Sequence, residues 1–336
     1  MRLKQNLIWF FEFFTQAKSF KDNPIIGSKT MNRMGLHVFR LVMAHLMTRF
    51  RWCLLFWRLD KKYRDAYHAQ GFVVIENFLP DVQFEKLNKQ LRAVTGGFLQ
   101  CRQGDTLTQR HIFEDVDASA AATFAQDKRL KGLFRYGGSA NHSPLMYIEH
   151  IRNGVLKKGE DPQKNLHSDT FHPTVKAWLY LDDVTEANGP LEYVEGSHRL
   201  DWKRIKWEYK KSLTAATSED SYTQRGSFRA RDKDLDELGL PQPKPFTVKK
   251  NTLVFANTYG FHRRGQANKG STRMSVYMQD RANPFWGFFA LDFKLFQQWR
   301  VAYLKNKQKR SEYEAAQHGR TPMWQPVDLT EQKEAA

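Results

Sequence analysis

Short apolar runs separated by Gly, Pro and Asn dominate the chain from residue 71 onward. The run GFVVIENFLP predicts a β-strand opened by Gly71 and closed by Pro80. Asp81 can cap the helix that Leu87 and Leu91 then indicate at helical spacing. Further strand-like runs follow: LMYIEHI, VKAWLYLDDV, LEYVEG, FTVKKNTLVFA and RMSVYMQD. Many short strands at this spacing predict a β-sandwich or barrel, whereas the glycine-rich phosphate loop of a nucleotide-binding sheet is not visible.

Segments of different composition and predicted secondary structure flank this strand-rich region. Residues 1–60 predict a basic, aromatic-rich helical extension, residues 61–285 a β-rich domain, and residues 286–336 a C-terminal helix with a polar tail. Inside the domain, residues 98–143 are irregular and polar, and residues 201–245 form a charged insertion with little strand signal. The sequence therefore predicts one large domain with appendages.

The N-terminal extension combines positive charge with long apolar runs. Residues 1–60 hold ten Lys or Arg against three acidic residues, a net charge of +7. The run GLHVFRLVMAHLMTRFRWCLLFWRL is long enough to cross a bilayer, but Arg40, Arg49 and Arg51 interrupt it at high cost. A signal peptide is disfavoured because Glu12 breaks the early apolar run. We expect helices that lie on an anionic membrane surface, with the arginines reaching the headgroups, or that pack over the barrel as a lid.

Overall composition narrows the class of partner. The 336 residues carry a net charge of +17, with a pI near 9.7, which favours nucleic acid, an anionic membrane or a charged substrate as the partner. The two cysteines, Cys53 and Cys101, do not make a disulfide framework. We therefore expect a cytoplasmic protein, peripheral at the inner face of the membrane if the extension binds lipid.

The stretch NLHSDTFHPTVKAW holds a candidate pair of metal ligands. Residues two apart in a strand point to the same face, so His167 and Asp169 can present an imidazole and a carboxylate side by side. A second histidine would complete two nitrogens and one carboxylate oxygen, a facial arrangement that leaves open positions and suits non-haem Fe(II). Alone, a His-x-Asp pair is a weak signal.

A later stretch supplies the third ligand. The strand-like run NTLVFAN leads to His262, and a glycine-containing turn separates it from a second run that holds Arg273. An antiparallel pair joined by this turn would bring Arg273 back alongside His262. A buried arginine opposite a metal can bind a carboxylate through two parallel hydrogen bonds. The sequence thus offers three metal ligands and an anchor for a 2-oxo acid.

At this point the chain resembles the phytanoyl-CoA dioxygenase family of iron- and 2-oxoglutarate-dependent oxygenases. The resemblance covers roughly residues 65–282. It rests on GFVVIENFLP followed by a helix, then HSD, AWLYLDD and NGPLEYVEGSHR in the family's order, closed by His262 and Arg273. The pair Arg263 and Arg264 departs from the small residues that we expect there, and it leaves positive charge close to the site.

The resemblance implies a mainly β fold, a double-stranded β-helix of the jelly-roll or cupin type with flanking α-helices. By position it implies that His167, Asp169 and His262 bind Fe(II), that Arg273 binds the far carboxylate of 2-oxoglutarate, and that Trp178 lies beside this cosubstrate. The implied activity is an O₂-dependent hydroxylation of a C–H bond, which ascorbate can assist in vitro. A carboxylate at Asp169 favours hydroxylation over halogenation, because related halogenases lack it.

The expected substrate is a small molecule, a lipid or a saccharide, with an anionic group as the natural match to the basic chain. A different class of protein is the alternative, namely a non-catalytic β-barrel that binds metal or sugar and serves as a membrane-associated scaffold. The complete set of three ligands and Arg273 argues against it. Nucleic acid is a less favoured partner, because much of the positive charge lies in residues 1–60, away from the ligands in sequence.

Overall fold

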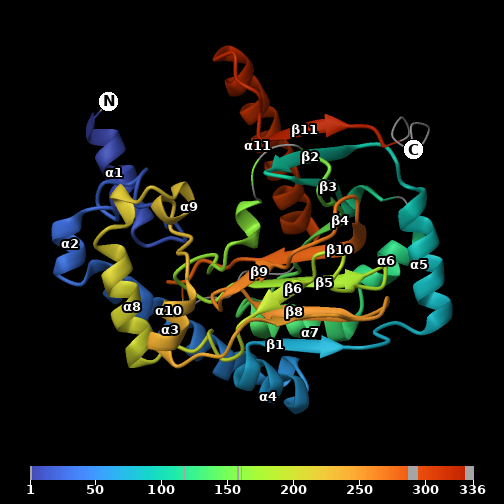
Figure 1. The fold of residues 1–336 in the computed structure, drawn as a ribbon, viewed down its shortest axis with the longest axis horizontal. Coiled ribbons are helices and arrows are strands. Elements are labelled where there is room, and N and C mark those ends of the chain that lie inside the picture. The colour runs from blue at the N-terminus through green and yellow to red at the C-terminus, as the bar shows by residue number, and fades with distance from the viewer. Residues whose placement is uncertain (1, 117, 157–158, 160, 287–293, 330–336) are drawn as a thin grey trace.

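Two β-sheets face each other at the centre of the molecule, and helices surround them (Figure 1). The computed structural model describes residues 2–116, 118–156, 159, 161–286 and 294–329. The runs with strand-like alternation supply both sheets. The chain therefore adopts the predicted jelly-roll class of fold, although more described residues lie in helices than in strands.

The large sheet has eight strands, and each strand is antiparallel to its neighbours. In sheet order they are β1 (Phe72–Ile75), β8 (Leu253–Asn257), β5 (Val175–Tyr180), β10 (Thr272–Asp280), β4 (Leu145–Arg152), β3 (Thr106–Ile112), β2 (Phe98–Gln103) and β11 (Trp324–Val327). The expectation that residues 98–143 are irregular is wrong, because β2 and β3 lie there. Their polar side chains, as in FLQCRQ, hide the period-two signal of a strand.

The small sheet holds β7 (Lys244–Pro245), β6 (Leu191–Tyr193) and β9 (His262–Arg264) in that order. Its inner face packs on the inner face of the large sheet through a buried aromatic cluster that includes Phe72, Trp178, Tyr180, Tyr193 and Tyr277. Side chains alternate along the strands of the large sheet, so each strand gives every second residue to this interior. The space between the sheets is where the site residues gather.

Helices cover the outer face of the large sheet. They are α4 (Lys61–Gln70), α5 (Asp81–Ala93), α6 (Ser119–Ala125) and α7 (Lys128–Gly137). Their apolar faces join the other set of alternating strand residues, such as Val175, Ala177 and Leu179 of β5, in the main hydrophobic core. Because β5 is buried on both faces, its sequence is a nearly continuous apolar run.

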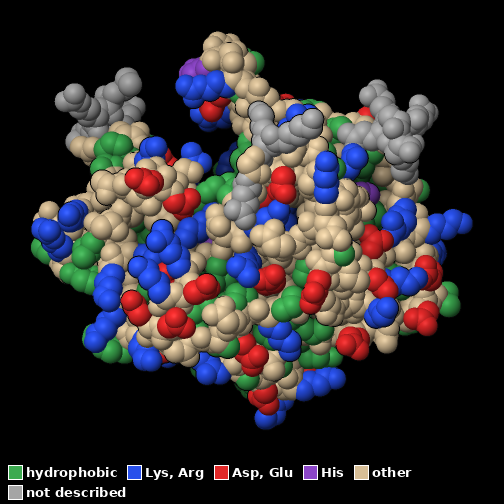
Figure 2. Space-filling model, viewed as in Figure 1, with side chains coloured by type: hydrophobic (Ala, Val, Ile, Leu, Met, Phe, Trp, Pro, Cys, Tyr) green, Lys and Arg blue, Asp and Glu red, His purple; other side chains and the backbone are tan. Residues whose placement is uncertain are grey.

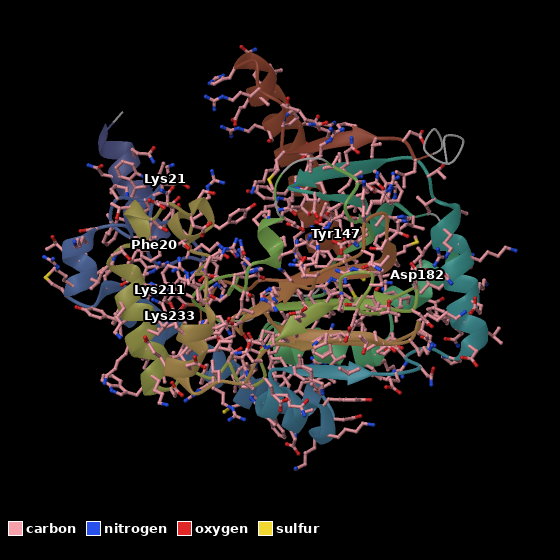
Figure 3. All side chains as sticks on the ribbon, viewed as in Figure 1. Phe20, Lys21, Tyr147, Asp182, Lys211 and Lys233 are labelled. Carbon is pink, nitrogen blue, oxygen red and sulfur yellow. The ribbon has the colours of Figure 1, made fainter. Side chains whose placement is uncertain are left out.

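The N-terminal extension and the insertion at residues 201–245 pack together beside the sheets. The extension forms α1 (Arg2–Glu12), α2 (Lys29–Arg33) and α3 (Leu36–Leu55); the insertion forms α8 (Trp202–Ser212), α9 (Ser221–Gln224) and α10 (Asp232–Leu238). Phe20 shares a buried cluster with Trp207 and Phe228, and His37 Nε2 lies 2.9 Å from Glu208. Labelled residues of both segments lie on the same side of the molecule (Figure 3). The helical extension is thus part of one packed body with the insertion.

Helix α3 buries a polar face. The Arg40 guanidinium donates to the backbone oxygens of Phe13, Thr15 and Ala17 at 2.6–3.1 Å, and its Cζ lies over the Phe171 ring, 4.4 Å from the centroid. Arg51 donates to Ser139 Oγ at 3.2 Å and to two backbone oxygens in the segment 283–286. The expectation that these arginines reach lipid headgroups is therefore wrong for Arg40 and Arg51, because their charges bind oxygens inside the protein.

The remaining long helix is α11 (Lys294–Gln317), which lies near β2 and β11 in Figure 1. No helix in the described ranges is long and apolar enough to cross a membrane. The two cysteines are unpaired: Cys53 is exposed on α3 and Cys101 is buried in β2. The division of the chain at residues 60 and 285 stays a prediction.

Replacing Arg40 by Ala should lower the free energy of unfolding by about 2–4 kcal/mol, since three backbone oxygens lose a charged donor. The same change at Arg49, which is exposed on the same helix, should stay within about 0.5 kcal/mol. Urea unfolding of both variants and the parent measures the difference. Equal effects at the two positions would contradict the anchoring role of Arg40.

Candidate metal centre and its pocket

Two histidines from distant parts of the chain pair through their backbones. The His167 N–H donates to the His262 oxygen at 3.0 Å, and the His262 N–H donates to the His167 oxygen at 2.9 Å. His262 begins β9, whereas His167 lies in a short extended segment that also bridges to Arg229. The two imidazole rings consequently lie side by side, with centroids 4.6 Å apart.

Backbone oxygens fix the tautomer of each ring. His167 Nδ1 lies 2.7 Å from the Asn165 oxygen, and His262 Nδ1 lies 2.9 Å from the Gly260 oxygen. A carbonyl oxygen only accepts, so each Nδ1 carries the proton and each Nε2 keeps a lone pair. These nitrogens lie 3.8 Å and 3.7 Å from Oδ1 of Asp169. One ligand atom of each of the three residues lies within 4.8 Å of the other two.

Asp169 is held in place from two sides. Lys176 Nζ lies 2.7 Å from its Oδ2, which leaves Oδ1 turned toward the histidines. Lys18, from the N-terminal extension, donates to the backbone oxygen of Asp169. Burial alone would raise the pKa of the Asp169 carboxyl, but the positive charge of Lys176 holds this pKa well below its usual range. Asp169 is therefore a carboxylate at neutral pH.

The protonation states suit a divalent metal. Burial is the main cause that lowers the pKa of His167 and of His262, so both imidazoles are neutral near pH 7. His262 Nε2 is buried and has no hydrogen-bond partner among the described residues. Leaving a buried acceptor unpaired costs free energy, which a metal bond would offset. Two neutral imidazole nitrogens and one carboxylate oxygen on one side of an ion fit Fe(II) and leave coordination positions open.

These ligand atoms lie at a cavity of about 280 Å³ between the two sheets. Trp178 and Arg273 line it too, so all five predicted site residues meet there. The expected hairpin, however, is absent: β9 pairs with β6 in the small sheet and β10 pairs with β4 and β5 in the large one. Arg273 thus lines the cavity from the opposite sheet. β9 and β10 do not pair with each other, because the chain crosses from the small sheet to the large one after β9.

Cations dominate the cavity wall, and most of them have partners. The lining includes Lys176, Arg110, Arg263, Arg264, Arg273 and Arg281. Arg110 lies 2.6 Å from Glu149, Arg263 2.6 Å from Glu192, and Arg264 2.5 Å from Asp161. Arg273 donates to the Gly189 oxygen. The exposed Arg281 side chain makes no ion pair with a described residue, so it adds uncompensated positive charge at the cavity.

Several lining residues were not predicted from the sequence. Lys176 and Tyr277 are pocket residues because Lys176 lies two positions before Trp178 on β5, and Tyr277 lies opposite Trp178 on β10. Applying the period-two rule outward from Trp178 would have found Lys176. The pairing of Arg110 with Glu149 could not be found that way, because β3 was not recognised as a strand.

Comparison with known proteins gives one family and a set of similar folds. The model of the phytanoyl-CoA dioxygenase family matches residues 67–274. A search of curated proteins gave no match. Similar solved structures include the non-heme α-ketoglutarate-dependent epimerase SnoN from nogalamycin biosynthesis, with 15% identity, a TM-score of 0.42, and coverage of 65% of this chain and 80% of that one.

Two further structures are similar to a comparable degree. HygX from Streptomyces hygroscopicus, solved with nickel and 2-oxoglutarate bound, has 18% identity and a TM-score of 0.41, covering 66% of this chain and 86% of that one. The non-heme α-ketoglutarate-dependent carbocyclase SnoK from nogalamycin biosynthesis has 17% identity and a TM-score of 0.41, covering 66% and 83% of the two chains.

Changing His167 or His262 to Ala should abolish stoichiometric Fe(II) binding, because each removes one of the three donors around the candidate centre. His172→Ala is the matched control: His172 is also buried, but it lies outside the group of donors. Anaerobic titration calorimetry with Fe(II) measures the stoichiometry. A doubly substituted His167/His262 protein that still binds one iron tightly would show that the ligands are wrong.

Proposed function

This chain belongs to the phytanoyl-CoA dioxygenase family, and we propose that it hydroxylates a C–H bond of a small-molecule, lipid or saccharide substrate, using Fe(II) held by His167, Asp169 and His262. Iron and 2-oxoglutarate are the cofactor and cosubstrate of this enzyme class. The observation that carries the proposal is the convergence of three ligand atoms on a cavity that also contains a buried arginine. A non-catalytic scaffold would not require that combination.

In the proposed reaction, the protein positions the metal ligands and encloses the site in a cavity between the sheets. When bound, iron and 2-oxoglutarate supply the oxidising chemistry, in which O₂ is consumed and succinate and CO₂ are released. The carbonyl oxygens of Asn165 and Gly260 orient the two imidazoles. Lys176 keeps Asp169 ionised and turned toward them. These contacts keep the imidazoles neutral and the carboxylate ionised, which are the forms that bind a divalent metal.

Arg273 is proposed to bind the far carboxylate of 2-oxoglutarate. Its side chain is buried, lines the cavity and uses one nitrogen, Nη1, to donate to the Gly189 oxygen. That bond orients the guanidinium and leaves other N–H groups for a carboxylate. Trp178 is proposed to lie beside the cosubstrate; it is buried on the same wall, and its ring centroid is 5.8 Å from that of Tyr277.

The carboxylate of Asp169 supports hydroxylation as the outcome. With iron bound, Asp169 would be the third protein ligand, and a halide would not be needed to complete the set. Proteins of similar fold include enzymes named as a non-heme α-ketoglutarate-dependent epimerase and a non-heme α-ketoglutarate-dependent carbocyclase. Product analysis therefore has to accompany any activity measurement.

We further propose that the substrate carries an anionic group. Arg264 is buried against Asp161, so it is a poor candidate for binding this group. Arg263 is partly exposed beside Glu192, and Arg281 is exposed without an ion-pair partner among the described residues; both line the cavity. These two arginines are where a phosphate or carboxylate of the substrate would be recognised.

The proposed place of action is the cytoplasmic face of a membrane, on an envelope precursor such as a lipid or lipid-linked saccharide. The net charge of +7 in residues 1–60 supports this, because basic residues favour anionic lipid surfaces. Exposed aromatic side chains in the same segment, among them Phe10, Phe11, Phe50 and Trp57, favour an interface as well.

Release of succinate tests the proposed reaction. Protein supplied with Fe(II), ascorbate and 2-oxoglutarate should form succinate in step with a product that has gained one oxygen atom. Phosphorylated or carboxylated saccharides and lipids should be turned over faster than their uncharged counterparts. The hydroxylase proposal would be refuted if the parent protein bound iron and 2-oxoglutarate but, with every saccharide and lipid tested, formed no more succinate than the His167→Ala protein.

Arg273→Lys should raise the KM for 2-oxoglutarate about 10- to 100-fold, because the ammonium group keeps the charge but loses the planar paired contact. Iron binding should be unchanged. Arg263→Lys, at a neighbouring and more exposed cation, is the control and should leave this KM unaltered. An unchanged KM in the Arg273 variant would exclude it as the carboxylate anchor.

A further inference from the structure

Helix α3 exposes a stripe of large apolar side chains, although polar side chains are buried on its inner face beside the apolar Leu41, Ala44 and Leu55. The side chains that point into the protein include His37, Arg40, His45, Thr48 and Arg51. The side chains that point outward are apolar, at spacings of three and four residues that place them on one stripe: Phe39, Met43, Leu46, Phe50 and Leu54, continued by Trp57. Phe39, Leu46 and Phe50 are each more than half exposed. A surface helix of a soluble protein turns such a stripe toward its core.

The buried polar face explains why the apolar stripe is left outside. Arg40 binds three backbone oxygens, Arg51 binds the 139 and 283–286 regions, and His37 pairs with Glu208. These bonds fix the rotation of α3 about its axis. The outward stripe is therefore a fixed feature of the fold and not a helix packed in the wrong register.

Helix α1 extends the apolar surface. The Phe13 ring, just after α1, stacks on Phe39 with centroids 6.3 Å apart. Five further apolar side chains around it are about half exposed or more: Leu7, Ile8, Phe10, Phe11 and Phe14. Most of the large exposed hydrophobic side chains of the described residues lie between positions 7 and 57. An apolar surface this extensive on one segment marks an interaction site.

The charge along the α3 part of this surface has one sign, and Glu12 of α1 accepts a hydrogen bond from Asn23. No acidic residue occurs between Asp22 and Asp60, whereas Lys29, Arg33 and Arg49 are exposed there. Arg58, at the end of the stripe, lies over the Trp57 ring at 3.7 Å. A symmetric contact between two copies of the chain would place these like charges against each other, which disfavours a dimer through this face. An apolar surface rimmed by cations instead matches acyl chains beneath anionic headgroups.

We propose that the outward stripe of α3, together with α1, docks on the surface of an anionic lipid bilayer. The stripe inserts to the level of the headgroup–acyl boundary, and Lys29, Arg33, Arg49 and Arg58 meet the headgroups. Arg40 and Arg51 take no part, because they serve the fold. This surface is the face of the protein that would contact the bilayer at the membrane location proposed above. Lipid docking does not depend on the oxidation reaction.

The test keeps the full chain, because residues 1–60 cannot be removed without harm to the site: Lys18 binds the backbone of Asp169, and Arg40 ties α3 to the segment before it. The native Cys53 is exposed beside the stripe, whereas Cys101 is buried. An environment-sensitive fluorophore on Cys53 should shift to the blue with vesicles of phosphatidylcholine and phosphatidylglycerol. The same dye on Val82→Cys in a Cys53→Ser protein should not shift, since α5 lies on the other side of the molecule (Figure 1). Equal shifts, or none at Cys53, would overturn the proposal.

Vesicle flotation of a triple variant provides the second arm. Phe39→Ser, Leu46→Ser and Phe50→Ser together should lower the partition coefficient on anionic vesicles at least tenfold, and high salt should weaken binding of the parent. The matched control carries Val82→Ser, Tyr313→Ser and Met323→Ser, all exposed outside residues 1–60, and should float like the parent. Unfolding temperatures check that each variant is folded.

Two outcomes separate this proposal from the others. If the parent stays unbound on anionic vesicles and sedimentation shows a dimer that the triple variant loses, the surface serves self-association and lipid docking is wrong. Succinate formation from a water-soluble substrate should be equal in the parent and the triple variant. Lost lipid binding with intact turnover thus concerns the docking surface alone, whereas absent turnover in both concerns the proposed reaction.

Discussion

The paired backbone hydrogen bonds between His167 and His262 are the constraint on which the candidate centre depends. They join a loop that precedes β5 to the first residue of β9, and so place two imidazoles side by side. Carbonyl oxygens then select the tautomer, and Lys176 turns Asp169 toward the pair. The two segments are joined by backbone hydrogen bonds, which do not depend on the identity of the side chains. The side chains of His167, Asp169 and His262 supply the candidate ligand atoms.

The composition of the cavity wall follows from the alternation of side chains along its strands. Alternation along β5 and β10 sends apolar residues to the helix-covered core and Lys176, Trp178, Arg273 and Tyr277 to the interior between the sheets. Acidic partners offset four of the six lining cations, so the wall is polar without a large net charge. Arg273, which donates to a backbone oxygen, and Arg281 have no acidic partner among the described residues. Under the proposed function, the cosubstrate carboxylate would bind at the buried Arg273 and an anionic group of the substrate at the exposed Arg281.

Sequence patterns predicted the strands that alternate cleanly, and they singled out His167, Asp169, His262 and Arg273, which the structure brings to one cavity. They missed β2 and β3, whose polar side chains mask the strand period, and with β3 the partner of Glu149. They also placed Arg273 in the wrong pairing, since the turn after β9 changes sheets. The helical extension was expected, but its orientation was not, because periodicity identifies a stripe without stating which side faces the protein. Arg40 settles that question through contacts that only tertiary structure reveals.

The most direct measurement of the central claim is anomalous diffraction at the iron edge from crystals grown without oxygen in Fe(II) and 2-oxoglutarate. The account predicts a single strong peak within bonding distance of His167 Nε2, His262 Nε2 and an Asp169 oxygen, with 2-oxoglutarate reaching from the metal toward Arg273. A peak bound by other residues, or iron at this place with 2-oxoglutarate directed away from Arg273, would contradict it.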